Sequence, residues 1–360
     1  MKKECIFCGQ RIDSKSKEHV LPKWLIALTG DPKRLVTFGL DKTLFMAKVT
    51  KFREFAFDQF QFPACIDCNA LFSRLEAFAE PVIRSLLDEK PLSDLDFHIL
   101  LDWLDKVRIG IWLGLRYLDN NFADIDPKFH IITRLGKKDR MLGIYRTSDE
   151  REGLTTIGCD GLAFIYNPSC FAMIVNELYI FNMSTDFLFS RRLGFPFPVK
   201  GHQRKEDRST LFLFSKGRER VMLPLLRYPL DLKGTEIYQP MFPHWKNCKE
   251  FYDIEYVHSN SLNFAKGAGS IFLQQDRNLY LYPHEPSDLW IPKARYPKHQ
   301  LGIEVISQTL KWQERLLNTA PSLDELPSES KKHWKKISAL GIKMNRTMRK
   351  SIKEKEKKIQ

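Results

Sequence analysis

The chain has 360 residues, with 57 Lys and Arg against 44 Asp and Glu, and a formal net charge of +13. Its hydrophobic content of 43%, including 26 Phe and 7 Trp, is enough for a packed core and excludes a wholly disordered chain. No apolar run approaches the roughly twenty residues of a membrane span, and the first residues lack the apolar segment of a secretory signal. We therefore expect a soluble, cytoplasmic protein without a transmembrane segment.

Four of the seven cysteines form two CxxC pairs, Cys5 with Cys8 and Cys65 with Cys68. Four thiolates arranged in this way are typical of a closed tetrahedral zinc site, which stabilises a small, loop-rich module and has no open position for catalysis. The alternative is two unrelated cysteine pairs. The sequence thus predicts a structural Zn²⁺ ion. The other three cysteines are predicted to be ordinary buried thiols: Cys159, Cys170 and Cys248.

Two further motifs accompany the cysteine pairs. The segment Lys17-Glu18-His19-Val20-Leu21-Pro22 follows the first pair, and Asn69 directly follows the second. The ordered set CxxCG, EHVLP and CxxCN, with Phe72-Ser-Arg-Leu-Glu76 after it, resembles the HNH endonuclease superfamily (the treble-clef or ββα-metal group) in its four-cysteine zinc subgroup. This resemblance covers about a quarter of the chain and implies a module at residues 1–90 that hydrolyses phosphodiester bonds.

The resemblance implies a role for each motif residue. His19 corresponds to the general base that takes a proton from the attacking water, which suits imidazole because its ordinary pKa is close to neutral pH. Glu18 and Asn69 correspond to ligands of a catalytic Mg²⁺ or Mn²⁺ ion, since hard ions take oxygen ligands. Glu76, two helical turns after Asn69, is an additional candidate ligand on the same helix face. The family often has His or Asn at this last position, which leaves the ligand count open.

Each of these roles has a structural alternative. His19 could be a packed histidine without a catalytic task, Asn69 could cap the helix that it begins, and Glu76 could be a solvated helix charge. The implied partner is nucleic acid, with DNA favoured over RNA by the resemblance alone. Three basic residues near the motifs are candidates for contacts with it: Lys17, Lys23 and Arg74.

Beyond the second cysteine pair the hydrophobic pattern predicts two helices, one over residues 71–86 and one over 94–120. From 129 to 290, short apolar and aromatic runs alternate with turns, which indicates strands at 162–166, 178–181, 211–214 and 221–226. The clearest hairpin spans 270–282, with its turn near 276–278. Residues 301–317 return to a helical pattern, and 319–330 have the composition of a linker.

The tail carries most of the excess charge. Residues 331–360 contain twelve Lys or Arg and two Glu, and their apolar residues recur three or four positions apart. We therefore expect a basic amphipathic helix, whose partner could be nucleic acid, an acidic protein groove or an anionic membrane. The predicted division of the chain is a nuclease module at 1–90, a mixed domain for target or partner selection at 91–318, a linker at 319–330 and a basic tail at 331–360.

The predicted fold class is α+β. It consists of an N-terminal ββα-metal (treble-clef) zinc module, a helix, a mixed β-rich domain and a C-terminal basic helix. The predicted function is a metal-dependent HNH endonuclease that acts on DNA, and the resemblance also suggests a role in antiviral defence. Two alternatives stay open: a catalytically inactive zinc-dependent nucleic-acid-binding or adaptor protein, and an effector subunit that is active only within a complex.

Overall fold

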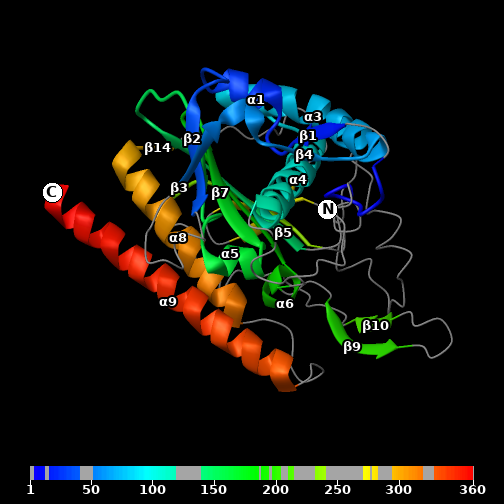
Figure 1. The fold of residues 1–360 in the computed structure, drawn as a ribbon. Helices are drawn as coiled ribbons and strands as arrows, with labels where there is room; N and C mark the ends of the chain where they lie inside the picture. The colour runs from blue at the N-terminus through cyan, green and yellow to red at the C-terminus, as the bar shows by residue number, and fades with distance from the viewer. Residues whose placement is uncertain are drawn as a thin grey trace.

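The computed structural model describes residues 4–12, 16–40, 52–118, 139–185, 188–193, 197–203, 210–214, 232–240, 271–275, 278–282, 294–318 and 328–359. Within these ranges the protein has the predicted α+β fold, with a cysteine cluster near the N-terminus and a long helix at the C-terminus (Figure 1). A central sheet separates helices that pack on its two faces.

The N-terminal part is built from short strands and one long helix. Strand β1 (Lys17–His19) pairs antiparallel with β4 (Gln61–Pro63), so that His19 lies opposite Gln61. The intervening elements are α1 (Lys23–Leu28), β2 (Leu35–Leu40), β3 (Phe52–Ala56) and the 3-10 helix η1 (Phe57–Gln59). Helix α3 (Ile66–Leu87) follows β4. Because a ladder of two three-residue strands is marginal by itself, it depends on the elements packed against it.

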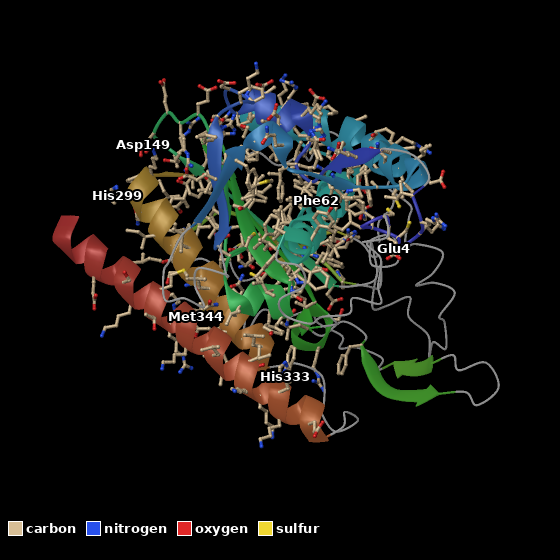
Figure 2. The ribbon with its side chains drawn as sticks, viewed as in Figure 1. Glu4, Phe62, Asp149, His299, His333 and Met344 are labelled. Carbon is tan, nitrogen blue, oxygen red and sulfur yellow. The ribbon has the colours of Figure 1, made fainter. Side chains whose placement is uncertain are left out.

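Helix α4 (Asp94–Leu118) packs directly against the β1–β4 ladder. Two glycines one helical turn apart, Gly110 and Gly114, permit the close approach. A Cβ atom at Gly114 would lie 2.6 Å from the ring of Phe62, and a Cβ atom at Gly110 would lie 3.0 Å from Val20. Phe62 is buried in the interior at this contact (Figure 2). The apolar residues of α3 and α4 belong to one core cluster, so the two helices are parts of one packed unit.

The central sheet runs in the order β13-β12-β11-β5-β8-β7-β6, and β14 pairs parallel with β5. The strands are β5 (Asp139–Thr147), β6 (Leu154–Ile157), β7 (Cys170–Val175), β8 (Leu178–Thr185), β11 (Thr235–Gln239), β12 (Phe272–Gln275), β13 (Asn278–Leu281) and β14 (Arg295–Tyr296). A separate two-stranded ladder joins β9 (Pro198–Gln203) and β10 (Thr210–Phe214).

Alternate residues of β5 face opposite sides of the sheet. Leu142 and Ile144 join the core cluster that contains α4, whereas Met141 and Tyr145 join the cluster that contains α8 (Lys298–Asn318). Since helices cover both faces, all nine residues of β5 are buried. Helix α9 (Ser328–Ile359) lies along α8, and the Arg349 guanidinium pairs with Glu314 of α8 at 2.9 Å (Figure 1).

A buried network of charged side chains joins α4 to the sheet. Arg140 of β5 pairs with Asp102 and Asp105 of α4. Arg108 pairs with Asp105 and donates to Asn182 of β8. Burial raises the pKa of Asp102 to about 6, because the loss of solvation outweighs the attraction of Arg140. Buried charges persist only where they are paired, so these contacts hold α4 in one position on the sheet.

The helices predicted at 71–86, 94–120, 301–317 and 331–360 are confirmed as α3, α4, α8 and α9. The predicted hairpin is confirmed as β12 and β13, and the runs at 178–181 and 211–214 lie in β8 and β10. The strand predicted at 162–166 is wrong: this run forms helix α5 (Leu162–Tyr166), which packs between α4 and α9. A short apolar run fits either a buried helix or a buried strand, and here the neighbouring helices decide. The run at 221–226 lies outside the described residues.

Helix α6 (Leu188–Leu193) is the one remaining described helix beside the sheet, and Asp139 accepts hydrogen bonds from the Ser190 backbone and hydroxyl at 2.7 and 2.8 Å. None of the helices in the described part of the chain combines the length and the apolar character that crossing a bilayer requires.

Candidate functional site

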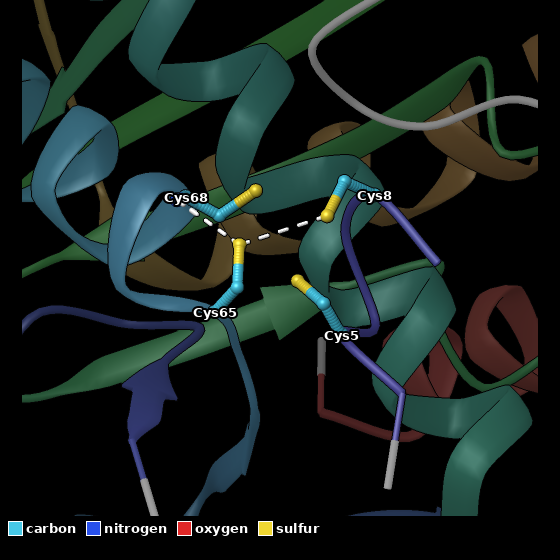
Figure 3. A group of neighbouring side chains, drawn as sticks. All are labelled: Cys5, Cys8, Cys65 and Cys68. Carbon is cyan, nitrogen blue, oxygen red and sulfur yellow. Dashed lines mark hydrogen bonds between the residues drawn. The ribbon is translucent and has the colours of Figure 1, made fainter. Parts of the chain in front are cut away.

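The four cysteines of the two CxxC pairs come together as predicted (Figure 3). Their sulfur atoms all lie within 4.8 Å of one another, and the Sγ atoms of Cys8 and Cys65 are 3.6 Å apart. The first pair sits in a tight turn, where the Gly9 amide donates to the Cys5 carbonyl at 2.8 Å and Gly9 has a φ of +72°. Cys65 is the N-cap of α3, and its Sγ atom accepts from the Cys68 amide at 3.4 Å.

The chemistry of this cluster fits a zinc ion. A tetrahedral site with Zn–S bonds of about 2.3 Å places the sulfur atoms about 3.8 Å apart, close to the spacing found here. A hydrogen bond from Cys68 lowers the pKa of the Cys5 thiol to about 4, whereas burial raises the pKa of Cys8 to about 11. Without a cation, these thiols cannot all ionise together. A divalent ion would stabilise all four thiolates and tie the N-terminal turn to α3.

His19 lies at the end of β1 and is half-buried. Its Nε2 atom is 3.1 Å from the Asp58 carbonyl oxygen and 2.8 Å from Nε2 of Gln61. The Gln61 amide also donates to the Asp58 carbonyl at 2.7 Å, so these three groups form a small network. Burial lowers the pKa of His19, and the nearby charges of Lys23 and Lys106 lower it further. The imidazole is therefore uncharged at neutral pH, the state that a general base requires.

Glu18 and Glu76 are brought together by a residue that the sequence analysis did not select, Lys106 of α4. Its ammonium group is fully buried and lies 3.0 Å from Glu18 and 2.5 Å from Glu76. It also donates to the backbone carbonyls of His19 at 2.8 Å and Val20 at 3.2 Å. Burial lowers the pKa of Lys106, but the two carboxylates outweigh this effect and the pKa is raised overall. Lys106 is therefore a permanent cation beneath the strand that carries Glu18 and His19.

The two carboxylates exceed the charge of Lys106 by one negative unit when both are ionised. Glu18 Oε1 is buried and lies 3.0 Å from the Lys106 ammonium, the cation with which it pairs. Burial raises the pKa of Glu18 in spite of the attraction of Lys106. The one negative charge that Lys106 leaves uncompensated fits an additional cation, and Glu18 and Glu76 are the residues that would supply oxygen ligands to a divalent ion.

Asn69 and His19 have contacts of their own outside this carboxylate pair. The Asn69 side-chain amide, in the first turn of α3, donates to the Ser16 hydroxyl at 3.0 Å. The cap of α3 is Cys65, so the side chain of Asn69 contacts the segment before β1 instead of capping the helix. Glu18 and His19 are consecutive strand residues and face opposite sides of β1. The three predicted basic contact residues are all exposed: Lys17, Lys23 and Arg74.

A cavity of about 510 Å³ lies elsewhere, at the end of α3 and the loop after β5. Its lining includes Arg146, Glu177, Glu89 and Arg295, which form ion pairs with one another, and it includes none of the predicted site residues. The chain matches no protein-family model, no curated protein and no solved structure. The likeness to HNH nucleases therefore rests on the motif residues themselves.

Proposed function

We propose that the N-terminal part of this chain is a zinc-dependent HNH-type endonuclease that hydrolyses phosphodiester bonds, with DNA as its substrate. The observation that carries the proposal is the position of His19. His19 is an uncharged, half-buried imidazole that directly follows the buried carboxylate of Glu18. It also lies opposite Gln61 of β4, four residues before Cys65 of the cysteine cluster. The order of the motifs along the chain, together with this short connection from His19 to the cysteine cluster, supports the proposal.

In this proposal each residue has a distinct task. His19 takes the proton of the attacking water, and the network with Gln61 and Asp58 orients its ring. Glu18, with Asn69 and Glu76 as further candidates, would hold the catalytic Mg²⁺ or Mn²⁺ ion. Such an ion supplies Lewis-acid stabilisation of the charge that develops on the phosphate. Lys17, Lys23 and Arg74 are exposed and would attract the substrate backbone.

A second candidate function keeps the zinc module and omits catalysis. The observation that favours it is Lys106, because its ammonium already provides one cation to Glu18 and Glu76 and is itself fully buried. If that cation satisfies the pair, the module would bind nucleic acid or a protein partner, or act as an effector subunit within a complex. An antiviral defence role belongs with either candidate, and its only support is the resemblance.

Cleavage of plasmid DNA by the purified, full-length protein separates the two candidates. The assay compares wild type with His19→Ala in Mg²⁺ or Mn²⁺ and in EDTA, and His299→Ala serves as the matched control because His299 is exposed on α8. Zinc content is measured in all samples. A general base contributes on the order of 10²- to 10⁴-fold, so His19→Ala should lower the rate by at least about 100-fold while His299→Ala cleaves like wild type.

The remaining outcomes are equally informative. Equal cleavage by wild type and His19→Ala would remove His19 from the mechanism. No cleavage by any variant, with zinc retained and DNA still bound, would reject the nuclease and favour the binding module.

A further inference from the structure

Helix α9 presents a strongly basic outer face. Its exposed cationic side chains are Lys332, Lys335, Lys336, Lys343, Arg346, Lys350 and Lys353. Lys336, Lys343 and Lys350 are spaced by seven residues, so they lie on one side of the helix and form a stripe about 21 Å long. Among the described residues of α9, the exposed acidic side chains are those of Glu329 and Glu354, near its two ends.

Little of this positive charge is compensated within the protein. Lys350 lies 3.9 Å from Glu354, and Arg346 lies 3.5 Å from Glu314. The other five cations of the face form no ion pair with a carboxylate in the part of the chain that the structure describes. Like charges three or four residues apart, such as Arg346 and Lys350, destabilise a helix. The basic face therefore does not serve the stability of α9, which indicates that it serves an interaction.

The opposite side of α9 packs against α8 and is not available to a partner. Asn345 is buried and donates to the Leu310 carbonyl of α8 at 3.2 Å, and a Cβ atom at Gly341 would lie 3.3 Å from Leu317. A helix that lies in a membrane surface needs a continuous apolar face for insertion. Leu340 and Met348 are the large apolar side chains of α9 that are exposed in the described structure, and the half-buried Met344 lies between them, one helical turn from each. This apolar stripe is about 12 Å long, which is shorter than the basic stripe. The basic stripe is therefore the main surface that α9 offers to a partner.

We propose that the outer face of α9 binds the phosphodiester backbone of duplex nucleic acid. A duplex presents one negative charge per about 1.7 Å of its axis, so a straight stripe of lysines can contact several phosphates without reading sequence. Helix α9 and the zinc module lie on different sides of the molecule, and His333 and Met344 mark the helix (Figures 1 and 2). The surface is therefore separate from the His19 site and does not depend on whether that site cleaves.

Fluorescence anisotropy with a labelled duplex of about 30 base pairs tests this surface, in full-length zinc-loaded protein without Mg²⁺, over about 50–200 mM salt. The test variant is Lys336→Glu/Lys343→Glu/Lys350→Glu. The matched control is Lys33→Glu/Lys90→Glu/Lys298→Glu, which changes the net charge equally at exposed lysines outside α9. A milder variant, with Gln at the same three positions of α9, covers the case in which the reversed charges disturb the helix. Circular dichroism checks the fold of each protein.

Wild type and control should bind alike, whereas the α9 variant should bind at least tenfold more weakly at the lowest salt. A plot of the logarithm of the association constant against the logarithm of the salt concentration has a negative slope. Each lost phosphate contact makes this slope shallower by about 0.9, so the loss of three contacts should make it shallower by up to about 2.7. The Gln variant should shift affinity and slope in the same direction. Equal losses in test and control variants, or absence of duplex binding by the wild type, would overturn the proposal. Binding of wild type to anionic phosphatidylserine vesicles in place of DNA, lost with the α9 variant, would overturn it in favour of a membrane.

Discussion

Replacement of Lys106 by Met tests whether the buried ammonium holds the N-terminal module together. The side chain of Lys106 is fully buried, and its Nζ atom contacts Glu18, Glu76 and the backbone carbonyl of His19 within 3.0 Å. Met has a similar shape without the charge, so the substitution removes the ion pairs with little change in packed volume. Glu18 and Glu76 then remain in the interior without their cation.

The expected loss of stability follows from the carboxylates that Lys106→Met leaves unpaired. Removing one partner of a buried ion pair costs about 3–5 kcal/mol, because the other charge stays in a poorly solvated position. The side chain of Glu18 is only 5% exposed, whereas that of Glu76 is 14% exposed and gains partial access to water. We expect the free energy of unfolding of Lys106→Met to fall by about 3–5 kcal/mol, most of it from Glu18. Urea denaturation of zinc-loaded protein, followed by circular dichroism, measures this loss.

The double variant Glu18→Gln/Lys106→Met is the matched control. It removes the ammonium together with the carboxylate that is least able to reach water, so it should recover more than half of the lost stability. Zinc content in every variant shows whether the cysteine cluster is still formed. A loss below about 1 kcal/mol for the single variant, the value of one ordinary hydrogen bond, or a double variant no more stable than the single, would refute this account of Lys106.

Three further predictions concern other parts of the fold. Cys68→Ser should reduce bound zinc and the melting temperature together, because a three-thiolate site is incomplete; zinc analysis and calorimetry measure both. Gly158→Ala should lower the free energy of unfolding by about 1–3 kcal/mol, since φ is +80° and the new Cβ would lie 2.7 Å from Thr309. Gly153→Ala is the control in urea denaturation: Gly153 also has a positive φ but no atom within 4 Å of the new Cβ, so its loss should be smaller. The folded protein binds the proton of Asp102 more tightly than the unfolded chain, because burial raises its pKa from 3.8 to about 6, so stability falls as pH rises from about 4 to 6. Asp102→Asn should remove this dependence, which amounts to about 3 kcal/mol, in urea titrations across that range.

The cysteine cluster and the long helices could be predicted because their patterns are local. The two thiols of a CxxC pair are neighbours in any compact turn, so spacing alone brings Cys5 to Cys8 and Cys65 to Cys68. The apolar periodicity of α3, α4 and α8 extends over many turns and leaves little room for another assignment. The roles of His19, Glu18 and Asn69 are of a different kind, since they came from resemblance and stay predictions.

Lys106 could not be selected from the sequence because all its partners are remote. It lies 87 positions from His19 and 30 from Glu76, and no spacing rule connects such residues. Lys106 is one of several charged residues of α4, together with Asp102, Asp105 and Arg108, so the local sequence does not distinguish it. The helix at 162–166 was missed for a related reason: its secondary structure depends on the helices α4 and α9 that pack on either side.

Helix α4 explains why the N-terminal part with the cysteine cluster is not separate from the rest of the protein. Within two helical turns it supplies Lys106 to β1 and α3, and Asp102 and Asp105 to Arg140 of the sheet. One and two turns further, Gly110 admits Val20, directly after β1, and Gly114 admits Phe62 of β4. A rigid helix with buried ion pairs on two sides cannot shift against one neighbour without breaking its ion pairs with the other and leaving buried charges unpaired. The unit that positions Glu18 and His19 therefore extends past the second cysteine pair and α3 to include all of α4.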